Sequence, residues 1–305
     1  MNKYNQFVKA SRMKVMPVIL IPILLGSASA YAWNDRFDLL LLIIALVGGG
    51  AIHLFSNMIN DLWDYRSGAD ATAKATEGAI STHSGYLTNG IWSLRRFATI
   101  TWALFAIAVV CGLLLAWLSG WEVLIFAAVG ALIAYFYVAP PIKLGYRGKG
   151  YSEIAILVAF GVLPVTGAYY VQTSQFDVHA LLLSIPIGLL TTLILYNHHF
   201  LHWKADKQAG KRTLVVVLGE HKALQFSKLL LLLAVLSIIA CIVVEVLPIY
   251  ALIALVPAFP ITRVYRTLKT TNESIAYLPL MGASVKASMN CGIILIVCLI
   301  IQGSI

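Results

Sequence analysis

The chain has 305 residues, of which 60% are hydrophobic and only 11% are charged, and its formal net charge is +9. Soluble globular domains carry about 25% charged residues, so a chain this apolar cannot cover itself with polar groups in water. We therefore expect an integral membrane protein. The positive charge fits loops that meet anionic lipid headgroups. We expect no nucleic-acid partner, because no stripe of basic and aromatic residues lies outside the apolar runs.

Nine apolar runs are long enough to cross a lipid bilayer, which takes about 20 residues per helix. Backbone groups in lipid must be satisfied internally, so each run is predicted to be helical. In chain order the predicted spans are 14–33, 38–62, 97–118, 121–139, 151–171, 178–202, 223–245, 247–265 and 285–303. The sequence thus predicts one all-α transmembrane domain over residues 1–305.

The distribution of Lys and Arg predicts the orientation of these spans. If the N-terminus faces the cytoplasm, Arg36 is the one basic residue that falls on the outer side. The positive-inside rule then favours a cytoplasmic N-terminus and an odd number of spans. Two long inner loops, about 63–96 and 203–222, follow the second and sixth spans. Long loops with polar motifs of their own usually carry function.

A first polar cluster closes the second span. Its members are Asn57, Asn60, Asp61, Asp64 and, in the following loop, Asp70. The first four are spaced by three and four residues, so they share one face of a helix. Carboxylates this close repel one another unless a cation lies between them, and oxygen ligands of this kind suit Mg²⁺. The alternative is a solvated helix end whose carboxylates pair with Arg66 and Lys74.

A second polar cluster closes the sixth span. Its members are His198, His199, His202 and Asp206, followed by Lys211 and Arg212. On one helix, residues 198, 202 and 206 would form a single stripe. Two imidazoles and a carboxylate suit iron, manganese or zinc better than Mg²⁺. Alternatively, protonated histidines beside Lys211 and Arg212 could clamp a phosphate group.

Three motifs occur in a fixed order between about residues 10 and 225. They are Asn60-Asp61-x-x-Asp64-x-x-x-Gly68-x-Asp70, then Tyr137-Val138-Ala139-Pro140-Pro141 continuing to Lys143 and Arg147, and finally Asp206 with Ala209-Gly210-Lys211-Arg212-Thr213. Together they resemble the UbiA-type intramembrane prenyltransferases, and most of all the 1,4-dihydroxy-2-naphthoate prenyltransferases of menaquinone synthesis. The last third of the chain matches only as apolar spans.

This resemblance implies a nine-helix bundle around a central cavity, a polyprenyl diphosphate donor and an aromatic acceptor. It implies Mg²⁺ as the cofactor and gives catalytic roles to Asp61, Asp64 and Asp206. The implied metal ligands are Asp61, Asp64, Asp70 and Asp206, to which His198, His199 and His202 are added as candidates. The implied substrate-binding residues are Asn57, Asn60, Lys74, Lys143, Arg147, Lys211 and Arg212.

The second cluster departs from the family pattern, which reads Asn-Asn-x-Arg-Asp-x-x-x-Asp. Here His198, His199 and His202 occupy three of those positions, and of the pattern only Asp206 remains. Mg²⁺ prefers oxygen ligands to imidazole, so we expect the second metal site to hold another divalent ion or none.

The leading hypothesis is prenyl transfer to a 1,4-dihydroxy-2-naphthoate-like acceptor in quinone biosynthesis, at the cytoplasmic side of the inner membrane. One alternative is a related enzyme that ionises the same donor, such as a terpene cyclase. Another is a metal-dependent membrane oxidoreductase that uses the histidines. A transporter or lipid-binding protein is disfavoured, because transporters place polar groups near the middle of the membrane and not at one face.

Overall fold

Long apolar helices make up most of the protein, which is seen here as a computed structural model that describes residues 2–68 and 84–305. Eight of the described helices are long and apolar enough to cross a membrane, and a shorter apolar helix covers Val123–Phe136. No strand occurs among the described residues. The prediction of an all-α, multi-pass membrane protein is confirmed, and the nine predicted spans correspond to these nine helices. Asp70 and Lys74 lie outside the described residues.

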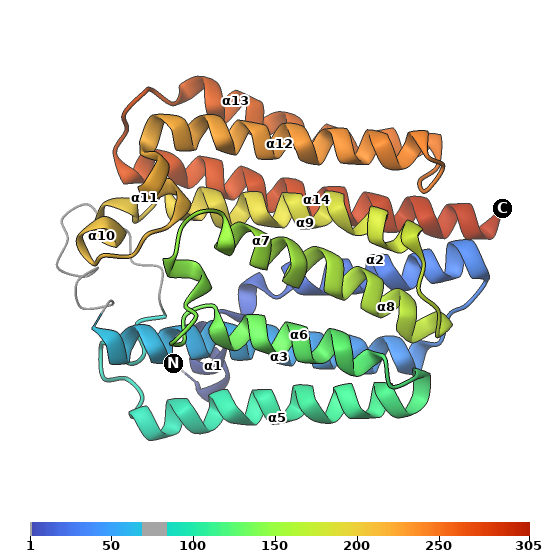
Figure 1. The fold of residues 1–305 in the computed structure, drawn as a ribbon, viewed down its shortest axis with the longest axis horizontal. Coiled ribbons are helices and arrows are strands. Elements are labelled where there is room, and N and C mark those ends of the chain that lie inside the picture. Colours follow the sequence, from blue (N-terminus) through green and yellow to red (C-terminus); the bar gives the residue numbers. More distant parts are fainter. Residues whose placement is uncertain (1, 69–83) are drawn as a thin grey trace.

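The helices run side by side along the long axis of the molecule (Figure 1). Their bounds are α1 Lys3–Ala10, α2 Pro17–Asn34, α3 Leu39–Ser67, α5 Leu94–Ser119, α6 Val123–Phe136, α7 Tyr151–Leu157, α8 Leu163–Thr173, α9 Val178–His199, α10 Trp203–Gln208, α11 Leu214–Leu218, α12 Glu220–Val243, α13 Phe259–Thr267 and α14 Leu278–Ser304. Short 3₁₀ segments cover Met13–Val15, Leu144–Tyr146, Ile249–Ala258 and Ser274–Tyr277, and a π-helical segment, η3, covers Val158–Val162.

Side-chain caps fix where the two site-bearing helices begin. The Asp38 carboxylate accepts hydrogen bonds from the backbone N–H groups of Leu40 and Leu41, at 2.8 and 3.0 Å. Asp177 accepts the backbone N–H of His179 at 2.8 Å in the same way. Such caps satisfy N–H groups that have no partner within the first turn. Both α3 and α9 therefore begin at the opposite end of the bundle from their polar clusters.

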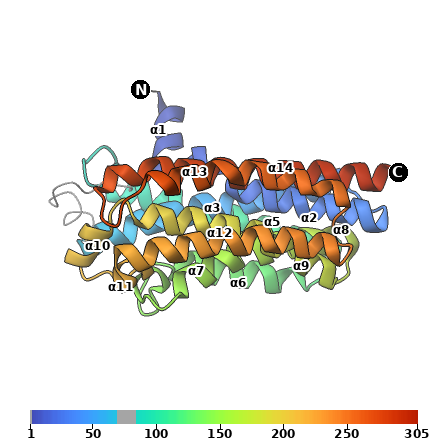
Figure 2. The same ribbon diagram turned by 90° about the horizontal axis from the view of Figure 1, so that it is seen from above.

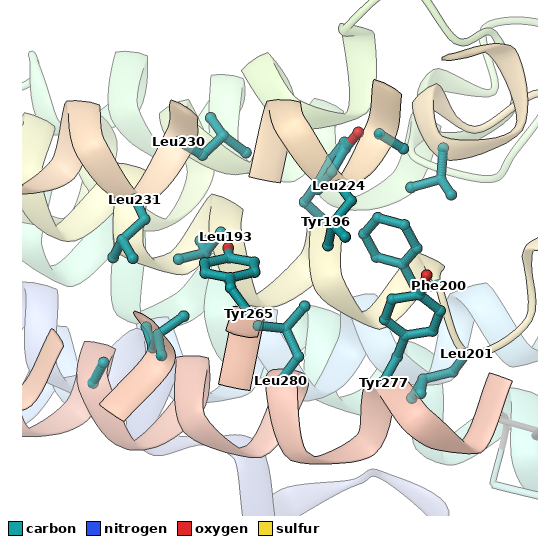
Figure 3. Close-up of a cluster of buried hydrophobic side chains, with 14 of the residues drawn as sticks. Leu193, Tyr196, Phe200, Leu201, Leu224, Leu230, Leu231, Tyr265, Tyr277 and Leu280 are labelled. Atoms are coloured by element: carbon teal, nitrogen blue, oxygen red, sulfur yellow. The ribbon is translucent and has the colours of Figure 1, made fainter. Parts of the chain in front are cut away.

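The sixth span is shorter than predicted. Helix α9 ends at His199, a turn follows at residues 200–202, and α10 then begins at Trp203. Residues 198, 202 and 206 therefore do not lie on one continuous helix, and the predicted stripe is wrong in this respect. The turn is held from behind by aromatic packing, because the Phe200 ring stacks on Tyr277 with centroids 4.5 Å apart (Figure 3).

The fifth span is irregular at its centre. Helices α7 and α8 are joined by the π-helical segment η3, which ends at Val162, two residues before Pro164 in the first turn of α8. Proline removes a backbone donor and clashes with the preceding turn, and π-helical turns of this kind are often found at functional sites. Gly161 in η3 packs against Gly188 of α9 so closely that a Cβ on Gly161 would lie 2.6 Å from the Gly188 Cα.

The polar clusters gather at one end of the bundle. Figure 1 shows α10, α11 and the end of α3 at the same end of the molecule, and the C-terminus of α14 at the other. Helix α1 projects beside this arrangement, and the chain then turns into α2 (Figure 2). At that turn Arg12 adopts a left-handed backbone conformation, with φ of 54°. Residues other than glycine seldom adopt this conformation, and Arg12 is itself the residue whose side chain enters the site.

Candidate active site

The last turns of α3 carry Asn57, Asn60, Asp61 and Asp64, as the sequence predicts. Asp61 is buried, with 4% of its surface exposed. Its Oδ2 accepts the backbone N–H of Ser84 at 2.9 Å, so the chain returns from the following loop directly onto this carboxylate. A carboxylate at this depth is stable only when it is paired or hydrogen-bonded.

Arg12 supplies the charge partner of Asp61. Its guanidinium forms an ion pair with Asp61 Oδ1 and donates a second hydrogen bond to the backbone carbonyl of Asn57, at 2.9 Å. The Asn57 amide in turn donates to the carbonyl of Ser11 at 3.1 Å. The segment between α1 and α2 is therefore fastened to the end of α3 by reciprocal contacts.

Asp64 has a different partner. The Tyr146 hydroxyl donates a hydrogen bond to Asp64 Oδ1. Among the described residues the ion pairs join neither Asp61 nor Asp64 to Arg66, whose guanidinium lies over the Trp63 ring at 5.6 Å. The alternative of a solvated helix end paired with Arg66 is therefore not what these residues form.

The histidines of the second cluster are brought together despite the break after α9. The ring centroids of His198 and His202 are 4.9 Å apart, and those of His199 and His202 are 6.0 Å apart. His202 Nε2 lies 3.4 Å from Asp206 Oδ2, without hydrogen-bond geometry. Burial lowers the pKa of His202 well below its usual value, and the other imidazoles and Lys211 act in the same direction. His202 is therefore a neutral imidazole near pH 7.

Tyr146 and Lys211 join the two clusters. Lys211 Nζ lies 4.8 Å from the centroid of the Tyr146 ring and 3.9 Å from Asp206 Oδ1. The backbone carbonyl of Tyr146 also accepts the N–H of Arg212 at 3.1 Å, which fixes the loop after α10 against the loop after α6. One continuous set of contacts thus runs from Asp64 through Tyr146 and Lys211 to Asp206.

The two carboxylates that end this set interact electrostatically. Burial raises the pKa of Asp206 to about 6, Lys211 opposes that rise, and the negative charge of Asp64 adds to it. The contacts from Asp64 through Tyr146 and Lys211 to Asp206 bring the Asp-rich and His-rich clusters together at the ends of the second and sixth spans.

The remaining predicted basic residues differ in how close they lie to the site. Lys143 also lies near the Tyr146 ring, with its Nζ 5.6 Å from the centroid, and it lines a pocket of about 120 Å³ together with Asp64 and Tyr146. Arg147 is exposed and donates to the carbonyls of Ile142 and Pro141 at 2.5 and 3.1 Å. Arg212 is also exposed. Of the predicted basic residues that the structure describes, Lys143 and Lys211 thus lie at the site and the two arginines lie at its rim.

The donor atoms of α3 fit a divalent cation that prefers oxygen. Asn60 Oδ1 is buried and has no hydrogen-bond partner among the described residues, and Asp61 and Asp64 lie on the same helix face. Within residues 2–68 and 84–305 no group of three His, Cys, Asp or Glu side chains is arranged to hold a metal ion. In the second cluster, His199 Nδ1, His202 Nδ1 and Asp206 Oδ2 are buried without hydrogen-bond partners in the described chain.

An apolar cavity of about 200 Å³ lies deeper in the bundle. It is bounded by α2, α3, α5, α6 and the η3–α8 segment, and small residues such as Gly49, Gly112 and Gly130 line it. Ile52 of α3 also lines the cavity, and Asn57 follows on the same helix just over one turn nearer the polar end. A polar, charged site and an apolar cavity therefore share α3 as a common wall.

Two site residues escape prediction from the sequence. Arg12 is counted there only as one of several basic residues before the first span, because no periodicity links it to residue 61. Tyr146 is part of the second motif, but a single tyrosine in a loop carries no signal of its own. The left-handed backbone at Arg12 and the side-by-side approach of two loops emerge only in the folded chain.

Comparisons with known proteins agree with this arrangement. The family model described as "UbiA prenyltransferase family" matches residues 19–283. The chain is 32% identical over 204 residues to a 2-carboxy-1,4-naphthoquinone phytyltransferase of Synechocystis, covering 66% of this chain and 62% of that protein. It is 31% identical over 239 residues to a 1,4-dihydroxy-2-naphthoate octaprenyltransferase of Haemophilus influenzae, covering 75% and 74%.

The fold itself has counterparts among solved structures. A UbiA homologue from Archaeoglobus fulgidus bound to GPP and Mg²⁺ superimposes with a TM-score of 0.65 and 18% sequence identity, over 96% of this chain and 99% of that one. The family match begins two residues into α2 and ends in the second turn of α14, so it covers both polar clusters. This chain therefore belongs to the UbiA prenyltransferase family.

Proposed function

We propose that the protein transfers a prenyl group from a polyprenyl diphosphate to a 1,4-dihydroxy-2-naphthoate-like aromatic acceptor, in quinone biosynthesis. The observation that carries this proposal is the set of contacts from Asp64 through Tyr146 and Lys211 to Asp206, placed next to an apolar cavity. A polyprenyl diphosphate has the same two parts, a strongly negative head and a long apolar chain. The names of the naphthoate-prenylating relatives support the same class of acceptor.

In this proposal the charged head of the donor lies between the clusters. Lys143, Lys211 and Arg12 bind the diphosphate. Lys143 lines the pocket with Asp64, Arg12 pairs with Asp61, and Lys211 lies over the Tyr146 ring beside Asp206. Asp61 and Asp64, with the unpartnered Asn60 Oδ1, would hold Mg²⁺, which would supply positive charge to neutralise the leaving group. Asp70 and Lys74 remain proposed members of the same site. Asp206 and the histidines form its opposite wall.

The apolar part of the donor lies in the cavity beneath. As the bond between the first prenyl carbon and the diphosphate oxygen breaks, its electron pair stays on the oxygen. The acceptor ring donates an electron pair to form the new carbon–carbon bond, and the attacked ring carbon loses its proton. Apolar walls exclude water, which would otherwise react with the allylic cation.

The chemistry is tested by giving purified protein Mg²⁺, a labelled polyprenyl diphosphate and a panel of acceptors that includes 1,4-dihydroxy-2-naphthoate and 2-carboxy-1,4-naphthoquinone. A prenylated ring formed together with diphosphate supports the proposal. Release of diphosphate without a prenylated ring contradicts it and favours a terpene cyclase. Absence of any release, with tightly bound iron or zinc, favours an oxidoreductase that uses the histidines.

The proposal also places the polar end at the cytoplasmic face of the inner membrane, with a cytoplasmic N-terminus. This orientation is supported by the distribution of Lys and Arg, because Arg36 is then the one basic residue on the outer side. A Lys207→Cys variant should react with a membrane-impermeant maleimide only after the cells are opened, whereas Arg36→Cys should react in intact cells whose outer layers are permeable. The opposite pattern would reverse the orientation.

A further inference from the structure

His53 is a buried polar residue that the proposed site does not use. It lies one turn deeper in the membrane than Asn57 on the same face of α3, and 7% of its surface is exposed. Ionisable residues inside a membrane span are costly and usually have a role in the function of the protein. The side chain continues the row formed by Asn57, Asp61 and Asp64 toward the apolar cavity.

The hydrogen bonding of its neighbour fixes which ring nitrogen of His53 carries the proton. Asn57 Nδ2 donates to the backbone carbonyl of Ser11 at 3.1 Å, which identifies this atom as the amide nitrogen, and it lies 3.4 Å from His53 Nε2. An amide nitrogen only donates, so Nε2 accepts. A neutral imidazole that accepts at Nε2 carries its proton at Nδ1. His53 Nδ1 is buried and has no hydrogen-bond partner within the described chain.

Along α3, His53 lies between the level of the cavity and the level of the polar cluster. Its chain neighbour Ile52 lines the cavity, as does Ala159 of η3, and Asn57 follows one turn later on α3. Phe160, the neighbour of Ala159, presents its ring at 88° to the His53 ring with centroids 5.5 Å apart. The π-helical turn thus places an aromatic ring against the imidazole. Along α3, the charged residues Asp61 and Asp64 follow His53, and the residues before it that line the cavity are apolar.

We propose that His53 Nδ1–H donates a hydrogen bond to the oxygen that joins the diphosphate to the first prenyl carbon. In a prenyl diphosphate this ester oxygen is the atom at which the charged head meets the apolar chain, so it lies at the level of His53 when the two parts occupy the site and the cavity. When the carbon–oxygen bond breaks, the electron pair remains on this oxygen and the proton remains on Nδ1. The hydrogen bond strengthens as negative charge develops on the oxygen, so it lowers the barrier to ionisation.

This inference rests on the proposed function, and its test separates the two. Purified wild type, His53→Leu, His53→Gln and His179→Leu are compared with geranylgeranyl diphosphate, Mg²⁺ and the acceptor that the wild type uses. If the wild type neither releases diphosphate nor prenylates an acceptor, the proposed function fails. His179 lies at the other end of α9 and is half exposed, so His179→Leu serves as the matched control.

We expect His53→Leu to lower kcat by about 10²-fold, the usual cost of removing one donor to a developing oxyanion, with KM for the diphosphate changed by less than about threefold. His53→Gln, which retains an N–H donor, should recover part of the rate, and His179→Leu should match the wild type. Leucine suits an apolar span and Asn57 keeps its bond to Ser11, so the variant should fold, which its size-exclusion profile checks.

A donor analogue with sulfur in place of the ester oxygen gives a second measurement, because a thioether-type sulfur is a weak hydrogen-bond acceptor. The ratio of oxygen-donor to sulfur-donor rates should be about 10-fold or more smaller in His53→Leu than in the wild type, since the variant has no hydrogen bond to lose. Equal ratios in the two proteins would overturn the proposal. A change confined to KM for the aromatic acceptor would also overturn it and would assign the Nδ1 donor to the acceptor.

Discussion

The ends of α3 and α9 face each other across the same site, yet they are built on different principles. At the end of α3, both carboxylates have protein partners: Asp61 pairs with Arg12, and Asp64 accepts from Tyr146. At the end of α9, His199 Nδ1, His202 Nδ1 and Asp206 Oδ2 are buried without partners in the described chain. At the first end Asp61 is thus balanced by a cation and Asp64 by a hydroxyl donor, whereas at the second end Lys211 lies 3.9 Å from Asp206 Oδ1 and several polar atoms have no partner.

The difference between the two ends lies in ligand type and not in net charge. His198, His199, Leu201 and His202 stand where the family pattern has two amides, an arginine and a carboxylate, so one positive and one negative charge are lost together. The His-rich end therefore offers fewer oxygen ligands than the family pattern. Because Mg²⁺ prefers oxygen ligands, the Asp-rich end should bind the cation more strongly than the His-rich end.

The largest expected effect comes from Asp64→Asn. It keeps the shape of the side chain and its contact with Tyr146 but removes the negative charge that the α3 cluster offers to a cation. We expect turnover to fall about 10³-fold in a prenyl-transfer assay, in the range seen when a group that stabilises a transition-state charge is lost. Asp35→Asn, an exposed residue at the other end of the bundle, is the control and should stay fully active. An active Asp64→Asn would remove the Asp-rich cluster from the mechanism.

The second prediction concerns how Asp61 is balanced. Arg12→Gln leaves a buried carboxylate without its charge partner. The Arg12 side chain is 30% exposed. We therefore expect the unfolding free energy to fall by about 2 kcal/mol, less than for a fully buried ion pair. Asp61→Asn should lower the unfolding free energy only slightly, since the amide needs no counter-charge. The double variant should be more stable than the sum of the two single losses implies, with a coupling of about 1–2 kcal/mol.

Unfolding in detergent, followed by far-ultraviolet circular dichroism, measures this cycle. Arg95 and Asp35 do not contact each other in the described chain. The effects of Arg95→Gln and Asp35→Asn on the unfolding free energy should therefore add. Additivity at Arg12 and Asp61 as well would mean that the guanidinium contributes no balancing charge to the folded protein.

The sequence predicts the fold and the α3 cluster well because both rest on local regularities. Span length and apolar composition identify the helices, and a spacing of three and four residues places Asn57 to Asp64 on one face of α3. The α9 cluster is predicted less well, since the helix ends at His199 and the stripe through residue 206 is interrupted. Phe200 stacks on Tyr277 from a distant part of the chain, and no local pattern can anticipate a helix end fixed by such a contact. Arg12 and Tyr146 are missed for the same reason.

The third prediction changes the ligand type of the second cluster. His202→Asp replaces the imidazole whose Nε2 lies 3.4 Å from Asp206 Oδ2 with a carboxylate, and makes this wall more like the α3 end. Mg²⁺ prefers oxygen ligands, so the Mg²⁺ concentration for half-maximal activity should fall about tenfold, equivalent to about 1.4 kcal/mol of binding. His202→Asn, which adds an oxygen without charge, is the control and should shift this value less. An unchanged Mg²⁺ requirement in both variants would mean that the second wall meets no cation.

The smallest expected effect concerns Tyr146, the residue that joins the two clusters. Tyr146→Phe removes the hydroxyl that donates to Asp64 but keeps the ring beneath Lys211. One hydrogen bond to a charged acceptor contributes about 1.5 kcal/mol, so we expect turnover to fall about tenfold at most, less than for Asp64→Asn. Tyr146→Leu also removes the aromatic face that positions the ammonium group, so KM for the diphosphate should rise in addition.

Comparing Tyr146→Phe with Tyr146→Leu in an Asp64→Asn background tests whether the two clusters act together. If Tyr146 only supports Asp64, the variant Tyr146→Phe should have no further effect in an Asp64→Asn background, since the hydroxyl then has lost its charged acceptor. If Tyr146 also positions Lys211, then Tyr146→Leu should still weaken diphosphate binding in that background, because the cation–ring contact at 4.8 Å does not depend on Asp64. Binding of a non-hydrolysable diphosphate analogue, measured by calorimetry, separates the two cases even where turnover is lost. A site in which neither variant changes binding would be one where the Asp-rich and His-rich ends work independently, whatever their contacts.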